Sequence, residues 1–411
     1  MFLELRKLHS NGAIRGYQLG AKYLLTPTSF EIIYSKQKAG CHIDSQPAFL
    51  QNIEEQQIRE RKIFMNRKKN FANLLKITCV MVCSCIGTQL VWADKTNSES
   101  ITDTAMGTDC SVRVYGSDGT AKDIMDMLSD IENKYLSWRI EGSDIANINE
   151  NASESEPVMP SKWTYSYLEN VLDLARKSSG AFDPTLGRVS QLWNLESDNP
   201  YIPSKSELTE LLLETGWEKI SLDGGEVFLK DGVQIDLGAV GKGIGCDEAQ
   251  KMLEEADADA AVVSVGGSIL TYGKKPDGKS WKIGIANPRT EDGESYLGSL
   301  TIDGTCSIST SGDYEKYVIE DGVRYHHILD PKTGYPADSG LISVTIVCEK
   351  GWLSDGLSTA CFVLGYEDSL PLLETYQAEA VFVTEDKEVI VTDGLKDMFT
   401  LTDSSYEQVE E

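Results

Sequence analysis

The segment IDLGAVGKG, Ile235–Gly243, says more about the fold than any other part of the sequence. Aliphatic residues over Val233–Leu237 predict a strand, the glycines after them predict a tight turn, and the pattern over Lys242–Glu254 predicts a helix. Such a turn presents backbone N–H groups at the start of the helix, where phosphate groups bind well. The glycine spacing matches neither the P-loop nor the dinucleotide-binding fingerprint. The segment alone therefore fits either phosphate binding or close packing.

The sequence on either side of this segment predicts a mixture of strands and helices. Further strands are expected at Ser111–Gly116, Ala261–Val265, Trp281–Ala286, Leu300–Ile302, Ile342–Val347, Ala380–Val383 and Val389–Val391. Further helices are expected at Lys122–Tyr135, Thr164–Ser178, Ser204–Thr215 and Leu353–Leu364. The helix at Ser204 opens with a Ser-x-x-Glu capping pattern, with Glu207 as the acidic partner. We expect one large α+β domain over residues 106–403, with a Ser/Thr/Asp-rich tether at 94–105 and an acidic tail at 404–411.

Charge is distributed unevenly along the chain. The 411 residues carry a formal net charge of −27, but residues 1–93 hold 13 basic and 6 acidic side chains, which leaves 25 basic and 59 acidic ones for residues 94–411. So acidic a body argues against a nucleic-acid partner, because phosphate backbones are bound by basic surfaces. The 41% of hydrophobic residues is enough for a substantial core. The body also lacks the long apolar runs of a polytopic membrane protein.

Residues 65–93 show the three-part pattern of an export signal. Its parts are a basic n-region at 67–69, a mostly apolar stretch at Phe71–Leu90 and a cleavage site at Val91–Ala93. A lipoprotein signal acylated at Cys85 fits the same stretch, as does a single anchor helix or a buried helix. Every interpretation except the buried helix places the body of the protein outside the cytoplasmic membrane. The body would then be attached to the outer face of the membrane only through this signal or lipid anchor. Residues 1–64 show no sustained period, and we expect an over-extended or poorly ordered leader before a natural start at Met65.

The cysteines after residue 93 are odd in number and widely spaced, which predicts single thiols rather than a disulfide framework or a zinc site. They are Cys110, Cys246, Cys306, Cys348 and Cys361.

After residue 93 the sequence has two histidines, and they are adjacent: His326 and His327 in RYHHILDPKTGYP. A base that works near neutral pH is expected here. The turn formers over Asp330–Pro336 predict a shaped loop rather than a strand, which is typical of functional sites. The alternative is that one histidine packs in the core and the other is exposed.

Three other segments place polar groups or glycines where a ligand could bind. Asp355 and Thr359 are four apart on an expected helix, so their oxygens share one face, and this pair suits Mg²⁺ or else a helix N-cap beside a core threonine. The segment Ser309–Tyr314 is polar and predicts a turn. Gly266 and Gly267 end an expected strand and would let a ligand approach the backbone.

Seven short blocks occur in an order that is more specific than any one of them. They are MGT at Met106–Thr108, GAFDPT at Gly180–Thr185, IDLGAVGKG at Ile235–Gly243, SVGG at Ser264–Gly267, STSGDYEKY at Ser309–Tyr317, HHILDPKTGYP at His326–Pro336 and SDGLSTA at Ser354–Ala360. Together they resemble the ApbE family, the FAD:protein FMN transferases, over nearly all of residues 104–400. The resemblance implies a T-fold-related α+β domain with a largely antiparallel sheet and a deep flavin cleft. An exported, often lipid-anchored location is also typical of that family.

The resemblance also implies roles for individual residues. For FAD binding it implies Met106, Trp138, Ala181, Phe182, Asp183, Asp236, Lys242, Gly266, Ser311, Gly312, Asp313 and Leu329. As Mg²⁺ ligands it implies the backbone carbonyl of Ala239 with Asp355 and Thr359, and as the base His327. The sequence departs from the family in two places. Arg139 stands where an aromatic residue is usual, one position after Trp138, and the glycine pair continues to Ser268 rather than Asp.

The chemistry implied by the resemblance is transfer of FMN from FAD to a protein. Mg²⁺ would neutralise the pyrophosphate, the base would take the proton of a threonine hydroxyl on an acceptor flavoprotein of a membrane redox complex, and AMP would leave. With water as the nucleophile, the same site would be an FAD pyrophosphatase. A third reading is an exported flavin-binding protein without turnover, which would need neither a metal nor a base.

Overall fold

The largest sheet of the protein is built almost wholly from antiparallel strands. The computed structural model describes residues 98–409 except for 196, 198, 231 and 291–294, and these residues belong to one compact unit, Trp92–Glu411. Within them nine strands pair in the order β1-β2-β5-β6-β9-β12-β13-β14-β16, and the pairing of β14 with β16 is parallel. The strands are β1 (Ser98–Ala105), β2 (Thr108–Tyr115), β5 (Ala260–Val265), β6 (Ser268–Gly273), β9 (Cys306–Gly312), β12 (Leu341–Cys348), β13 (Glu379–Thr384), β14 (Glu388–Val391) and β16 (Glu407–Val409).

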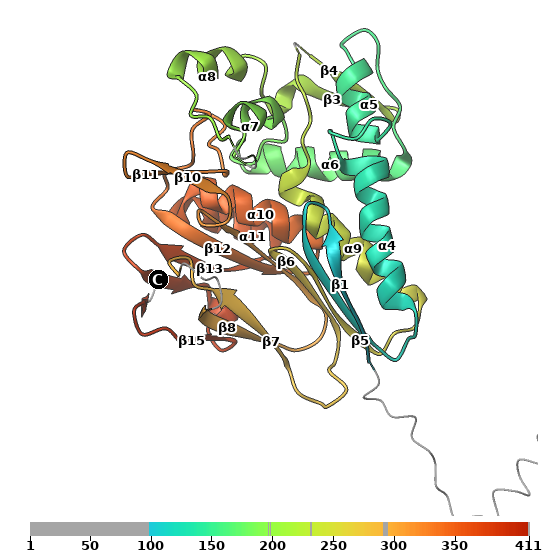
Figure 1. Cartoon of the computed structure of the whole chain (residues 1–411), viewed down its shortest axis with the longest axis vertical. Helices are drawn as coiled ribbons and strands as arrows, with labels where there is room; N and C mark the ends of the chain where they lie inside the picture. The colour runs from blue at the N-terminus through green and yellow to red at the C-terminus, as the bar shows by residue number, and fades with distance from the viewer. Residues whose placement is uncertain (1–97, 196, 198, 231, 291–294, 410–411) are drawn as a thin grey trace, which may run out of the picture. The chain divides into compact units, whose positions relative to one another are not determined.

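The two faces of this sheet are covered differently (Figure 1). Helices pack on one face and a three-stranded sheet packs on the other. The smaller sheet consists of β7 (Trp281–Ala286), β8 (Tyr296–Ile302) and β15 (Phe399–Leu401). Strand β13 shows the alternation that this arrangement requires, because Ala380 and Phe382 belong to the helical core while Val381 and Val383 belong to the core under the three-stranded sheet.

The helices and the remaining hairpins lie mainly on the helical side of the sheet. The helices are α4 (Thr120–Ile131), α5 (Asp144–Asn151), α6 (Lys162–Lys177), α7 (Gly187–Trp193), α8 (Lys205–Leu212), α9 (Gly238–Glu255), α10 (Gly351–Leu364) and α11 (Tyr366–Tyr376). The two-stranded hairpins are β3 (Ile220–Asp223) with β4 (Glu226–Leu229), and β10 (Tyr317–Glu320) with β11 (Val323–His326). The predictions for α4, α6, α8, α9 and α10 are confirmed, as is the capping box of Ser204 and Glu207. None of the helices in the described part of the chain is long and apolar enough to cross a membrane.

The strand expected over Val233–Leu237 does not form, and α9 begins at Gly238 rather than Lys242. Its backbone is bonded to a side chain and to loop carbonyls rather than to a neighbouring strand, with the N–H of Asp236 donating to the carbonyl of Pro184 at 2.8 Å. Asn149 of α5 accepts the N–H of Ile235 at 2.7 Å and donates to the carbonyl of the same residue at 2.8 Å. Val233, Ile235 and Leu237 are buried, but the prediction of a strand over this run was wrong.

Both ends assigned outside the domain belong to the sheet. The residues expected as a tether form β1, which pairs with β2 from Ser98 to Ala105. An edge strand has one free side, so polar side chains do not prevent it from forming. In the expected acidic tail, Tyr406 is buried and its hydroxyl donates to Asn287 at 2.9 Å, and β16 follows it. The leader and export signal predicted over residues 1–93 lie outside the described residues.

Candidate functional site

Two glycines bring helices α9 and α10 into backbone contact. A Cβ atom on Gly243 would lie 2.0 Å from the carbonyl oxygen of Gly351, and one on Gly351 would lie 2.1 Å from the carbonyl oxygen of Gly243. No side chain fits between the helices at this point. Asp247 of α9 fixes the start of α10, because its carboxylate accepts the N–H groups of Gly351 at 2.6 Å and Trp352 at 2.9 Å.

Asp355 lies where these helices meet. Its buried carboxylate accepts the N–H of Gly243 at 2.9 Å and lies 3.6 Å from the ammonium of Lys242, whose pKa is raised chiefly by this charge. In a regular α-helix the N–H of Gly243 is the donor to the carbonyl of Ala239. Asp355 shares that donor, and the carbonyl oxygen of Ala239 has a second lone pair that can accept another partner.

The donor set of Ala239, Asp355 and Thr359 fits a hard cation. Thr359 lies one turn after Asp355 on α10 and is partly exposed. Among the described residues no cluster of three or more His, Cys, Asp or Glu side chains could hold a metal, so an ion here would have one carboxylate and neutral oxygens as ligands. Mg²⁺ accepts few protein ligands and completes its coordination with water and phosphate oxygens. The residues present therefore suit Mg²⁺ together with a phosphate-bearing substrate.

The two adjacent histidines have different surroundings. His326 ends β11 and is buried against Phe362, with its Nδ1 accepting the N–H of Ile328 at 3.3 Å and its Nε2 lying 3.2 Å from the carbonyl oxygen of Ala337. Both ring nitrogens of His326 are thus engaged with the backbone. The Nδ1 of His327 has no hydrogen-bond partner in the described part of the chain. His327 follows the hairpin directly, is partly exposed and precedes the loop predicted over Asp330–Pro336.

Burial and the charges of two lysines oppose protonation of His327. Burial, followed by the charges of Lys316 and Lys242, lowers the pKa of His327 to about 3. Its N–H donates to the carbonyl of Lys316 at 3.0 Å. Lys242, which lies 3.6 Å from Asp355, is thus one of the charges that act on His327.

Two of the expected flavin-binding residues, Met106 and Trp138, pack against the helical core. Met106, with a positive φ of 53°, lies over the glycine face of α9, where a Cβ on Gly245 would be 3.2 Å from its sulfur. Trp138 is partly exposed, and its buried Nε1 has no hydrogen-bond partner among the described residues. The guanidinium of Arg139 lies 4.2 Å from the ring centroid of Trp138, so the departure at 139 covers one face of this ring.

The AFD triplet and Asp236 are held by local hydrogen bonds. Ala181 and Phe182 are buried, with Phe182 in the helical core. Asp183 accepts the N–H and hydroxyl of Thr185 and the N–H of Trp217, and desolvation raises the pKa of its carboxyl. Asp236 accepts the N–H of Gly238 at 2.8 Å and so supports the start of α9. These carboxylates organise the two loops that meet beside α9.

The turn predicted over Ser309–Tyr314 is wrong for its first four residues, because Ser309–Gly312 belong to strand β9. The polar side chains have partners across the sheet and on α10, which a turn prediction does not consider. Gly312 leaves room for Tyr314, whose ring would lie 2.2 Å from a Cβ at that position. Asp313 is buried in a bidentate pair with Arg289, at 2.7 and 2.8 Å.

Gly266 and Leu329 are also structurally constrained. Gly266 has a positive φ of 54°, and a Cβ there would lie 2.7 Å from the hydroxyl of Thr108. Leu329 is buried in a small cluster with Val189, Trp193 and Leu208. The side chain of Leu329 therefore serves the core of the loop region.

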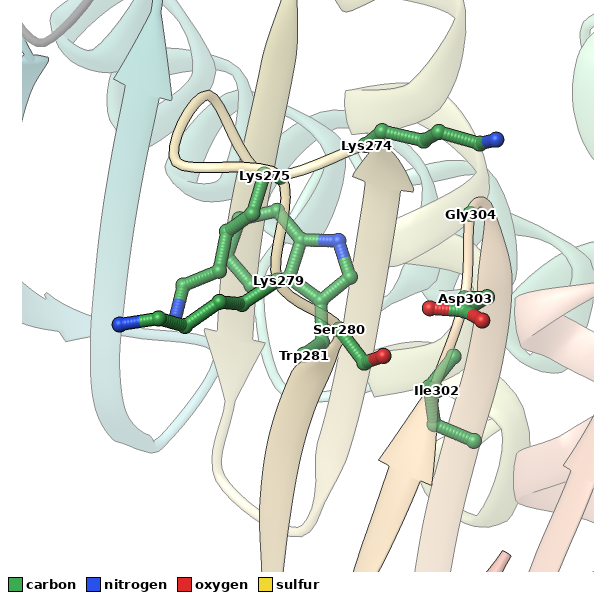
Figure 2. Close-up of a pocket in the computed structure, with 9 residues that line it drawn as sticks. Lys274, Lys275, Lys279, Ser280, Trp281, Ile302, Asp303 and Gly304 are labelled. Atoms are coloured by element: carbon green, nitrogen blue, oxygen red, sulfur yellow. The ribbon is translucent and has the colours of Figure 1, made fainter.

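Two cavities lie away from these residues. One, of about 190 Å³, is lined by the β6–β7 turn with its three lysines, of which Lys275 and Lys279 lie beside Trp281 while Lys274 points away from it (Figure 2). The other, of about 730 Å³, lies beside α5 and α7 and is lined in part by Asn149, Arg188 and Gln191. No predicted site residue lines either cavity, so neither is the expected flavin cleft.

Sequence reasoning missed the residues that support the site. Glu315 is exposed, and its carboxylate lies beside Gly267, where a Cβ would be 3.3 Å from it. Lys316 supplies charge and a backbone carbonyl to His327, and Gly351 makes the close helix crossing. Glu315 and Lys316 belong to the STSGDYEKY block, so the sequence motif could have predicted that they lie near the site.

The fold and the site define an α+β enzyme suited to a phosphate-bearing substrate. The family model described as "ApbE family" matches residues 106–382, and the chain belongs to this family. The curated "FAD:protein FMN transferase" of Treponema pallidum is 35% identical over 324 residues, which cover 73% of this chain and 88% of that protein. A protein of the same name from Klebsiella pneumoniae is 30% identical over 310 residues, covering 74% and 95%. The chain is accordingly a transferase.

Solved structures show the same fold. The ApbE protein from Thermotoga maritima superimposes with a TM-score of 0.67 at 33% identity, covering 74% of this chain and 99% of that one. The apo form of the flavinyl transferase ApbE from Pseudomonas stutzeri gives a TM-score of 0.65 at 27% identity, covering 75% and 98%. These matches confirm the expected ApbE-like α+β fold.

Proposed function

We propose that this chain is a Mg²⁺-dependent FAD:protein FMN transferase that attaches FMN to a threonine of an acceptor protein and releases AMP. The observation that carries the proposal is the buried carboxylate of Asp355 at the crossing of α9 and α10, where it accepts the N–H of Gly243 and lies 3.6 Å from the ammonium of Lys242. The names of the relatives support the transfer of FMN from FAD to protein. The donor set supports the choice of Mg²⁺.

The residues of the chain have separate tasks in this reaction. Ala239, Asp355 and Thr359 would hold Mg²⁺, which when bound supplies positive charge to the pyrophosphate and its developing oxyanion. Lys242 and Lys316 attract the same anionic group. The imidazole of His327 takes the proton of the threonine hydroxyl, whose oxygen then attacks the phosphorus on the FMN side. The bond from that phosphorus to the bridging oxygen breaks, and AMP leaves with that oxygen.

Substrate binding is expected to activate the base. A histidine with a pKa near 3 is a weak base in the free protein, because positive neighbours and burial both oppose its protonation. A bound pyrophosphate brings negative charge to Lys242 and Lys316 and offsets their effect on His327. The pKa of His327 then rises towards the range in which general bases work.

We also propose that the protein acts outside the cytoplasmic membrane, on an exported flavoprotein of a membrane redox complex. The support is the export-signal pattern at residues 65–93 and the acidic composition of the rest of the chain.

The proposal is tested by incubating the protein with FAD, Mg²⁺ and a threonine-bearing candidate acceptor and recording the intact mass of the acceptor. A gain of one FMN residue, lost with EDTA and in Asp355→Ala, is the expected result. Acceptors with the threonine replaced by valine serve as the control. FMN and AMP in solution beside an unmodified acceptor would instead indicate the pyrophosphatase, and bound FAD that stays intact in every condition would indicate a binding protein without turnover.

A further inference from the structure

Hydroxyl groups join strand β9 to helix α10 at two places. Ser309 and Ser311 are two apart on β9 and so lie on the same face of the strand. The Oγ of Ser309 lies 2.8 Å from that of Ser354, and the Oγ of Ser311 lies 2.7 Å from that of Ser358. Each contact ties one turn of the helix to the strand.

The direction of the second contact follows from its continuation into α10. Ser358 donates its hydroxyl proton to the carbonyl oxygen of Asp355 at 2.8 Å. A carbonyl can only accept and a hydroxyl has one proton, so Ser311 must be the donor in its 2.7 Å contact with Ser358. Ser311 is then left with lone pairs alone for the hydroxyl of Thr359, whose Oγ1 lies 3.4 Å away. Thr359 is therefore the donor in that contact.

This direction matters because a hydroxyl binds a cation through its lone pairs. We propose that Ser311 is a positioning residue for the metal site: it accepts the proton of Thr359 and leaves the lone pairs of Thr359 free for a divalent cation. The inference rests on the proposed function, in which Thr359 is a metal ligand. It gives Ser311 a different task from the flavin contact that the resemblance implies, since the described contacts of its hydroxyl are with α10.

The chain offers a matched control at Ser309. It lies on the same strand and face and makes the same kind of hydroxyl contact with α10, but its partners are Ser354 and Ser268 rather than Thr359. Loss of either hydroxyl removes one link between β9 and α10. Only the loss at Ser311 removes the acceptor for a metal ligand.

The test measures binding of Mn²⁺, as a paramagnetic substitute for Mg²⁺, to the full chain by electron paramagnetic resonance, with and without FAD. In Ser311→Ala we expect the dissociation constant to rise about tenfold, the lower end of the effect of removing a partner of a metal ligand. Ser309→Ala should bind Mn²⁺ like the wild type, and Ser311→Thr, which retains the hydroxyl, should recover most of the affinity. Thermal unfolding of all variants reports the structural cost of each change.

The outcomes separate the two proposals. Wild-type affinity in Ser311→Ala would overturn the positioning role and leave the proposed metal site intact. Equal loss of affinity in Ser309→Ala and Ser311→Ala would also overturn it, because the contact would then act only through packing. If wild type and Asp355→Ala both fail to bind Mn²⁺, the metal site of the proposed function itself fails.

Discussion

His327 is held neutral by its surroundings, and this has a consequence for stability as well as for catalysis. The unfolded chain protonates this histidine below a pH of about 6.5, whereas the folded chain does so only near pH 3. Between these values the unfolded state binds more protons, so the free energy of unfolding falls as the pH is lowered. The contribution of His327 is complete above pH 6.5 and is lost progressively towards pH 3.

We therefore predict that His327→Gln loses less stability on acidification than the wild type does. The difference should grow by about 1.4 kcal/mol per pH unit between pH 6 and pH 4. Denaturant unfolding at a series of pH values measures it. The carboxyls with raised pKa values, such as those of Asp183 and Asp247, act in the opposite sense but are common to both proteins. Parallel curves for the two proteins would contradict the lowered pKa.

The sequence predicts candidate site residues, but it does not show which of their side chains are engaged in hydrogen bonds or ion pairs within the fold. The adjacency of His326 and His327 predicted a base in this part of the chain. Only the structure shows that the backbone engages both ring nitrogens of His326, because its partners Ile328 and Ala337 depend on how the loop closes. Asp313 was nominated as a flavin contact, and its pairing with Arg289 depends on a residue 24 positions away.

Because α9 and α10 cross in backbone contact, we predict opposite effects on stability for alanine substitutions at two glycines of α9. Gly243→Ala should destabilise the protein by roughly 3 kcal/mol or more, since the new methyl group meets backbone rather than a side chain that can move. Gly241→Ala should be neutral or stabilising, because its Cβ meets only Met106 and Leu136, at 3.7 and 3.8 Å, and alanine favours the helix. Thermal unfolding of both variants tests the pair. Equal stability of the two would rule out the close crossing.

The C-terminal strand makes a second prediction about an element. Tyr406→Ala should cost about 3 kcal/mol through the cavity it leaves, whereas Tyr406→Phe should cost only about 1 kcal/mol for the bond to Asn287. Glu407→Ala, at an exposed position of β16, is the control and should change little. An acidic tail outside the fold would tolerate all three changes, so chemical denaturation distinguishes the two descriptions.

Elements with a strong period of their own were predictable, and those that depend on distant partners were not. Helix α6 and strand β7 follow from their own side-chain patterns, and β7 has the bounds expected, Trp281–Ala286. Strand β1 is rich in Ser, Thr and Asp, and it forms because β2 offers a free edge along eight residues. The same reason explains why Ser309–Gly312 looked like a turn: its hydroxyl groups find partners on α10 that are far away in the sequence.

At the scale of the whole molecule, charge is the dominant property. The net charge of −27 should slow encounter with an acidic acceptor protein, because like charges repel over roughly 10 Å at 0.1 M salt. We predict that raising the salt concentration from 20 to about 200 mM increases kcat/KM for an acidic acceptor by roughly tenfold and decreases it for a basic one. Initial-rate assays of FMN transfer measure kcat/KM at each salt concentration. They use two acceptors of opposite charge that carry the same threonine segment. The same salt response for both would show that surface charge does not guide the encounter.

The two hydrogen bonds from Asn149 make the backbone of Ile235 depend on a single side chain. A strand shares its protection from solvent exchange among many neighbours, whereas the amide of Ile235 is shielded by one carboxamide. In Asn149→Ala that amide should exchange its hydrogen for deuterium faster than in the wild type, while the amides of β5 stay slow. The segment that leads into α9 could thus open locally, and isotope exchange would record the motion without unfolding the molecule.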